Sequence, residues 1–268
     1  MQFFNEQPLY EDMLKSYEPG LQTGLGKFDE FVGGLKKGKL YIVSAPTGAG
    51  KTTFMIAMAM RVARMYPDEK VLFIATEQDA KEIKVKFLSS ATNIEQGRVE
   101  SGNLDENEMK KVLEAEQKMS NIAFQYYEDY DFDLKGCLDE AVEMGIKYVF
   151  YDYLGALVSL NDVKLYQTLE KLTDDIKRYA TQNNIFIMTA TQCSNDINNL
   201  VNIPDLFTEK FLANSKGIAR KADVGFILYR IPDSHNGEAF LDMYKNRWAG
   251  QRRLEIRLDY AKNRIYEK

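Results

Sequence analysis

The chain has 268 residues, of which 45% are hydrophobic and 28% charged, and its formal net charge is −5. This composition fits one globular domain or two small ones, and it excludes a membrane protein, because no run of 18 apolar residues occurs, and a disordered chain. The first residues lack a basic region followed by an apolar core, so we expect no signal peptide and a cytoplasmic location. Two cysteines, Cys137 and Cys193, exclude a disulfide framework or a cysteine zinc site, and a single histidine, His235, excludes a His-rich metal site. Any chemistry therefore depends on carboxylates, lysines, arginines and a recruited metal.

The charge is distributed unevenly along the chain. Residues 209–268 hold 13 Lys or Arg and 8 Asp or Glu, whereas residues 100–143 hold 13 acidic and 4 basic residues. An acidic balance argues mildly against nucleic-acid binding, but the basic C-terminal part leaves that function open. Two solvated surfaces of opposite sign are an equally good interpretation of this pattern.

Residues 1–20 are interpreted as a polar N-terminal arm. The arm holds one short amphipathic stretch from Leu9 to Tyr17, and Glu18-Pro19-Gly20 ends it.

From Leu40 onward, apolar runs typical of buried strands alternate with stretches of helical periodicity. The predicted strands are 40–44, 71–75, 122–126, 148–151, 185–190 and 224–229, and the predicted helices are 51–64, 80–91, 105–119, 133–144 and 163–180. Three later stretches, 239–245, 252–258 and 264–266, have the pattern of short hairpin strands. The alternation predicts an α/β fold with a mostly parallel, twisted sheet, helices on both faces and a C-terminal β-hairpin region.

A glycine-rich loop follows the first predicted strand and opens a predicted helix. Its residues are Ala45, Pro46, Thr47, Gly48, Ala49, Gly50, Lys51, Thr52 and Thr53. This is a Walker A loop with alanine in place of the first glycine. In such a loop backbone N–H groups surround the β-phosphate, Lys51 reaches the β- and γ-phosphate oxygens, and the hydroxyl of Thr52 ligates Mg²⁺. The sequence therefore predicts that ATP and Mg²⁺ bind here.

Three polar side chains follow other predicted strands, at the edge where parallel sheets bind ligands. Asp152 ends an apolar strand, which is the Walker B position that holds the metal, although such a residue is often only a helix cap. Glu77 is placed to polarise the attacking water, or it is a surface residue that starts a helix. Gln192 is placed to bond the γ-phosphate or the water, or it is a polar strand end.

Together these positions resemble the RecA-like hexameric ATPases, and most closely the motor domain of DnaB-type replicative helicases. The resemblance runs from about Leu21 to the C-terminus, so it divides the chain into an arm or linker, 1–20, and a motor domain, 21–268. Besides the residues above, the matching motifs are Thr23-Gly24-Leu25-Gly26-Lys27-Phe28-Asp29, Gly33-Gly34-Leu35, Thr76-Glu77-Gln78, Asp152-Tyr153-Leu154, Ala222-Asp223 and Lys245-Asn246-Arg247. The resemblance implies a helicase that uses ATP and Mg²⁺ to move along single-stranded DNA during DNA replication.

The resemblance also implies a homo-oligomer, as a hexameric ring. In the family, the residues that match Lys245 and Arg247 cross the subunit interface to the γ-phosphate bound by the neighbour. An arginine supplied in trans stabilises the charge that develops on the transferring phosphoryl group. Glu77, Lys51 and Gln192 would supply the other catalytic side chains. Without the resemblance, Lys245 and Arg247 are ordinary residues on one face of an exposed strand.

The DNA contact is predicted from the loop between Cys193 and Lys216. The family holds phosphates with an Arg-Glu-Ser-Gly segment, and the aligned stretch here is Ala213-Asn214-Ser215-Lys216, which lacks the arginine. Asn214 and Lys216 are therefore the candidate DNA contacts, with a solvated loop as the alternative.

Several alternatives remain open at this level. The resemblance does not include the family's N-terminal domain, which contacts primase, so primase and a helicase loader are partners that the resemblance alone suggests. We expect residues 1–20 to match the linker helix, and the chain to be a minimal phage-type helicase, a fragment or an accessory protein. A RecA/RadA-like recombination ATPase and a KaiC-like regulatory ATPase that does not act on DNA are the competing functions.

Overall fold

The computed structural model describes residues 14, 18–126, 133–154, 165–193, 197, 216–231 and 237–268. Most of the predicted arm, Asn214 and His235 lie outside these ranges, and so does the side chain of Lys216. Within the described ranges, no helix is long and apolar enough to cross a membrane.

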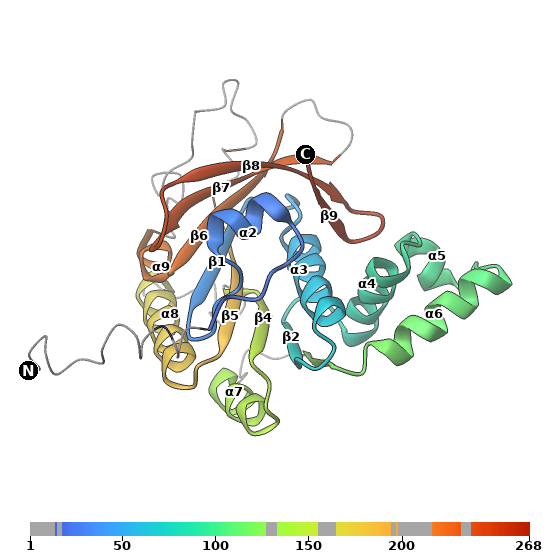
Figure 1. Ribbon diagram of the computed structural model, residues 1–268, viewed down its shortest axis with the longest axis horizontal. Coiled ribbons are helices and arrows are strands. Elements are labelled where there is room, and N and C mark those ends of the chain that lie inside the picture. Colours follow the sequence, from blue (N-terminus) through green and yellow to red (C-terminus); the bar gives the residue numbers. More distant parts are fainter. Residues whose placement is uncertain are drawn as a thin grey trace, which may run out of the picture.

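The described residues form one nine-stranded sheet with the strand order β3-β2-β4-β5-β1-β6-β7-β8-β9 (Figure 1). The strands are β1 (Leu40–Ala45), β2 (Val71–Ala75), β3 (Ile122–Tyr126), β4 (Tyr148–Asp152), β5 (Phe186–Gln192), β6 (Val224–Arg230), β7 (Glu238–Asn246), β8 (Arg252–Asp259) and β9 (Arg264–Glu267). The first six strands are parallel, and β6 to β9 are joined by antiparallel pairing. This confirms the predicted parallel sheet with an antiparallel C-terminal extension.

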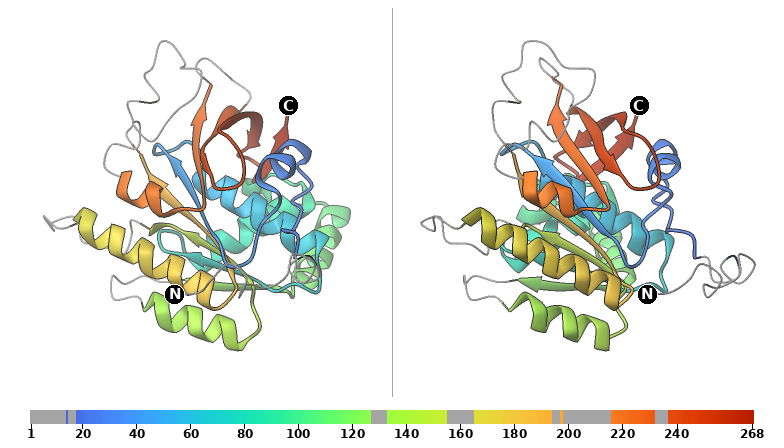
Figure 2. Two further views of the ribbon diagram at one scale, coloured as in Figure 1. Left: turned by 60° about the vertical axis from the view of Figure 1, so that its left-hand side comes forward. Right: turned by 90° about the vertical axis from the view of Figure 1, so that its left-hand side faces the viewer.

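Helices cover both faces of the parallel part of the sheet (Figures 1 and 2). They are α2 (Gly26–Val32), α3 (Lys51–Met65), α4 (Ala80–Thr92), α5 (Gln96–Ser101), α6 (Glu106–Lys118), α7 (Leu134–Glu143), α8 (Leu165–Gln182) and α9 (Lys216–Lys221). Apolar side chains of α2, α3 and α4 pack on one face, and those of α7, α8 and α9 pack on the other.

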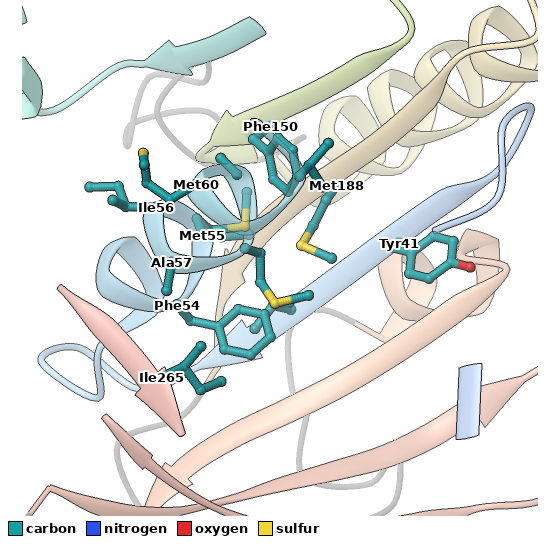
Figure 3. Close-up of a cluster of buried hydrophobic side chains, with 14 of the residues drawn as sticks. Tyr41, Phe54, Met55, Ile56, Ala57, Met60, Phe150, Met188 and Ile265 are labelled. Carbon is teal, nitrogen blue, oxygen red and sulfur yellow. The ribbon is translucent and has the colours of Figure 1, made fainter. Parts of the chain in front are cut away.

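The helix that follows the glycine-rich loop is the most deeply buried. Ten of the 15 residues of α3 are buried, and Phe54, Met55 and Met58 are fully inaccessible to solvent. Figure 3 shows α3 side chains packed between Met188 and Phe150 of the sheet on one side and Ile265 of β9 on the other. Burial of this extent stabilises the helix far more than its intrinsic propensity does. The glycine-rich loop therefore rests on a rigid support.

The motif from Thr23 to Asp29, which precedes β1, has a structural role. The Asp29 carboxylate is buried and accepts hydrogen bonds from the backbone N–H of Thr23 at 2.8 Å, the Thr23 hydroxyl at 2.9 Å and the Gly24 N–H at 2.9 Å. A carboxylate that accepts several N–H and O–H bonds fixes the turn whose residues donate them. The motif thus orients α2 over the antiparallel strands.

A buried ion pair joins β7 to β8. Asp242 is fully buried, and both of its carboxylate oxygens accept bonds of 2.7 Å from Arg253, while the Tyr229 hydroxyl donates to it at 3.2 Å. Removing the arginine would leave a buried carboxylate without its counter-charge, which is far more costly than losing an exposed pair.

We therefore expect Arg253→Met to lower the free energy of unfolding by about 3 kcal/mol, measured by urea denaturation. The matched control is Arg257→Met on the same strand, because Arg257 is exposed and its guanidinium lies over the ring of Tyr266. The control should change stability by no more than about 0.5 kcal/mol. Equal effects of the two substitutions would contradict a special role for the buried pair.

Candidate functional site

The predicted site residues meet at one edge of the parallel sheet. The register pairs Ala45 at the end of β1 with Gln192 at the end of β5, and Ala75 at the end of β2 with Asp152 at the end of β4. The glycine-rich loop starts at Ala45, and Glu77 follows Ala75 by two residues. Four strand ends thus bring the loop, two carboxylates and an amide together, as the sequence predicted.

The backbone of the glycine-rich loop requires glycine at position 50. Gly50 precedes α3 with a φ of 100°, and an added Cβ would lie 2.7 Å from the Tyr260 ring and 2.8 Å from Leu258. Both the left-handed backbone and this close approach exclude larger residues. The first N–H groups of a helix have no acceptor in a preceding turn, so those that begin α3 are suited to bind an anion.

Lys51 is folded back onto the loop. Its ammonium donates hydrogen bonds of 3.3 Å to the carbonyl oxygens of Ala45 and Pro46. Burial lowers the pKa of Lys51, while the nearby charges of Asp152 and Glu77 act in the opposite direction. A partly desolvated ammonium held at the loop by two carbonyl oxygens can strongly attract phosphate oxygens.

The side chains of Thr52 and Asp152 are in direct contact at the predicted metal position. The Thr52 hydroxyl donates a 2.6 Å hydrogen bond to the carboxylate of Asp152, which is buried. Burial raises the pKa of Asp152, and the Thr52 hydroxyl and the Lys51 ammonium act against that rise. One hydroxyl and one carboxylate are oxygen ligands of the kind that Mg²⁺ takes when phosphates and waters supply the rest. Within the described ranges no group of three or more His, Cys, Asp or Glu side chains is arranged to hold a metal.

Glu77 and Gln192 flank this position. The Glu77 side chain is exposed, and its charge acts on both Lys51 and Asp152. The Gln192 amide donates a hydrogen bond to the Thr47 hydroxyl inside the loop. The structure therefore brings together every residue that the sequence predicted for the phosphate, metal and water positions.

Two side chains that the sequence did not indicate also contact the loop. Arg230, at the end of β6, donates to the Gly48 carbonyl at 2.7 Å, and its guanidinium lies 4.8 Å from the ring centre of Tyr260. The Tyr260 hydroxyl donates to the Ala49 carbonyl at 3.3 Å. These two residues are 30 positions apart and follow different strands, so no local pattern links them. Only the sheet order places them side by side.

Lys245 and Arg247 lie away from this edge. Arg247 forms an ion pair of 2.9 Å with Asp223, which is buried and also accepts a 3.0 Å hydrogen bond from the N–H of Leu40. The Lys245 ammonium donates to the carbonyl of Arg220 in α9. Leu40 begins β1, whereas the glycine-rich loop follows its last residue.

The two parts of the predicted site are therefore separated by the whole length of β1. Six residues of β-strand span about 17–20 Å. This distance exceeds the reach of an arginine side chain. Within one chain, Arg247 and Lys245 cannot approach a phosphate held by the glycine-rich loop.

Comparisons with solved structures agree with this fold. A solved ATPase domain has a TM-score of 0.81 at 17% identity, covering 96% of this chain and 95% of that one. A DnaB-like replicative helicase, described together with its interactions with primase, has a TM-score of 0.79 at 17% identity, covering 96% of this chain and 64% of that one. At this level of identity the likeness shows a shared RecA-like ATPase fold.

Sequence comparison identifies the family. The replicative DNA helicase DnaB of Helicobacter pylori is 24% identical over 219 residues, which cover 79% of this chain and 44% of that protein. The chain spans about half the length of the curated relatives it matches. The family model described as DnaB-like helicase C-terminal domain matches residues 20–265. This match favours the DnaB-type resemblance over the RadA-like and KaiC-like alternatives, and the chain belongs to the family of DnaB-like helicase C-terminal domains.

Proposed function

We propose that this chain is an ATP-hydrolysing DNA helicase motor that moves along single-stranded DNA as a ring of identical subunits. The observation that carries the proposal is the division of the predicted catalytic residues between two ends of β1. The phosphate loop, Glu77, Asp152 and Gln192 occupy one end, and the cations Lys245 and Arg247 occupy the other.

This division gives the reason for an assembly. A phosphate position at one end of the chain and a cation pair at the other end complete each other only between neighbouring subunits. Contacts of this head-to-tail kind close into a ring when the rotation between subunits allows it. Because each bound nucleotide then spans two subunits, hydrolysis at the interface is coupled to their relative movement. We propose a hexamer, in line with the family.

The roles of the individual side chains follow from their positions. Lys51 and the first N–H groups of α3 hold the phosphates, and Thr52 and Asp152 hold Mg²⁺, which neutralises phosphate charge when bound. Glu77 accepts a proton from the attacking water, and Gln192 bonds the γ-phosphate. Arg247, with Lys245, stabilises the charge that develops on the neighbour's transferring phosphoryl group. The stacked pair of Arg230 and Tyr260 closes one side of the nucleotide position.

The proposed partners are inferred from the family and not from contacts in the structure. The loop that follows Gln192, including Asn214 and Lys216, remains the predicted contact for DNA phosphates. A primase or a helicase loader is a proposed partner, and a cytoplasmic location, in a bacterial cell or in the host of a phage, is proposed with it.

The proposal predicts that single-stranded DNA stimulates ATP hydrolysis and that the protein separates a forked duplex in an ATP-dependent manner. Both activities are measured on the same preparation. Blunt duplex DNA is the control, because it has no single-stranded end on which the ring could bind. A ring motor should show stimulation by the single strand and strand separation only with the fork. Hydrolysis that is indifferent to DNA, together with no strand separation, would contradict the helicase function.

A further inference from the structure

A β-bulge lies in the pairing of β6 with β7, directly beside Lys245. Gly225 pairs with Lys245, but the next residue, Phe226, pairs with Met243. Tyr244 is the extra residue of β7 at this point. A bulge of this kind changes which face of the sheet the following side chains occupy.

The contacts of the residues around the bulge show this change of face. Tyr244 packs with Ile227 in the cluster on the α9 side of the sheet, and the next residue, Lys245, reaches the carbonyl of Arg220 in α9. Asn246 projects to the opposite side, where its amide donates to the carbonyl of Phe31 in α2 at 2.8 Å. Two consecutive side chains, Tyr244 and Lys245, thus share one face.

This arrangement decides where the predicted trans-acting cations point. In a strand without a bulge, side chains alternate strictly, so a residue after Tyr244 would point to the α2 side. Lys245 and Arg247 would then project over α2 and away from Arg220 and Asp223. The bulge reverses the alternation and turns both cations to the α9 side.

At the bulge, the ring of Tyr244 lies directly against the backbone of Gly225. A Cβ on Gly225 would lie 2.6 Å from Cε2 of Tyr244 and closer still to Cζ and the hydroxyl oxygen. The Tyr244 ring therefore occupies the space that any other residue at position 225 would need. The ring is buried, and it packs against Cys193, which follows Gln192.

We propose that Gly225 and Tyr244 are positioning residues that orient Lys245 and Arg247 for catalysis at the neighbouring subunit. The inference rests on the proposed function, because it requires that these two cations act on a nucleotide held by another subunit. Glycine at position 225 admits the tyrosine ring, the ring fixes the bulge, and the bulge sets the direction of the catalytic side chains. Neither residue touches the nucleotide itself.

The central test is Gly225→Ala in the full chain. The added methyl displaces the Tyr244 ring and shifts the bulge, so we expect kcat for ATP hydrolysis to fall about 10- to 100-fold, the effect of a displacement near 1 Å. The dissociation constant for ATP should stay unchanged, because the chain's own phosphate loop lies at the other end of β1. The matched control, Tyr244→Phe, keeps the ring and should have a kcat close to that of the wild type.

Two further variants keep the test decisive if Gly225→Ala folds poorly. Tyr244→Ala removes the ring without a clash and should also lower kcat at constant ATP affinity. The double variant Gly225→Ala/Tyr244→Ala should match Tyr244→Ala alone, because the added methyl then has no ring to displace. Additive losses in this cycle would overturn the role of the contact.

The Arg247→Ala background separates this inference from the proposed function. If the bulge acts through Arg247 and Lys245, Gly225→Ala should lower kcat little further once the arginine is absent. A full additional loss in that background would indicate a merely structural role and overturn the inference. Normal turnover of Gly225→Ala beside an inactive Arg247→Ala would overturn the positioning role alone, whereas normal turnover of Arg247→Ala would refute the proposed function.

Discussion

Lys51→Ala is expected to reduce ATP turnover by at least about 100- to 1000-fold, the effect of removing one well-placed donor from a charged transition state. The ammonium of Lys51 is the partly buried cation of the phosphate loop, and alanine offers nothing to the β- and γ-phosphate oxygens. The measurement is steady-state hydrolysis at saturating ATP. A variant that still hydrolyses ATP at the wild-type rate would contradict the assignment of the loop.

The same variant has a readout that does not depend on turnover. A ligand that binds only the folded state raises stability by about 2.7 kcal/mol at roughly 100 times its dissociation constant. ATP should therefore raise the melting temperature of the wild type, and much less that of Lys51→Ala. Lys110→Ala is the matched control, because this exposed lysine lies on α6, away from the loop. It should keep both the activity and the ATP-dependent shift.

The parts of the fold that the sequence predicted well are those with strong local patterns. β1, β2 and β4 are buried over their whole length, and each begins with a run of apolar residues. The longer helices were predicted to within a few residues, and Asp105 and Asp133 cap α6 and α7 at the predicted starts. Local propensity, burial and capping agree in these segments, so their secondary structure can be predicted from a single sequence.

The short helices were missed for a physical reason. α2, α5 and α9 have six or seven residues each, which is too short for a hydrophobic period to repeat. α2 also directly follows the turn at Thr23 and Gly24 that the Asp29 carboxylate organises, and these residues favour a turn over a helix. Such segments are stable only through packing against the rest of the molecule.

The residues of the candidate site also differ in whether a local sequence pattern indicates them. Asp152, Glu77 and Gln192 were found because each follows a strand in the sequence, and parallel strands end at one edge. Arg230 and Tyr260 were not predicted because their nearness depends on the order of strands in the sheet. The bulge at Tyr244 was not predicted either, because both faces of β7 carry apolar side chains, Leu241 and Met243 on one and Phe240 and Tyr244 on the other. The reversed alternation is therefore not visible in the sequence.

Arg247→Ala is expected to lower kcat for ATP hydrolysis by about 1000-fold or more, as the loss of an arginine finger does, with ATP affinity unchanged. Affinity should persist because Arg247 lies about 17–20 Å from the chain's own phosphate loop. The fold should also persist, since Asp223 keeps its contacts with Lys177 at 2.9 Å and the Leu40 N–H at 3.0 Å. Equilibrium binding of ATP and single-turnover hydrolysis measure the two quantities separately. Loss of affinity with normal turnover would refute the finger assignment.

Mixing the two inactive variants decides whether Arg247 acts in trans. In a ring, a subunit with Arg247→Ala still has an intact phosphate loop, and a neighbour with Lys51→Ala still has its arginine. Random mixing in equal amounts places these complementary halves at about one interface in four, so the mixture should recover hydrolysis that neither variant shows alone. If both residues served the same subunit's nucleotide, every subunit would lack one of them and mixing would restore nothing. Recovered activity would therefore require that the two ends of β1 belong to one catalytic site shared by neighbouring chains.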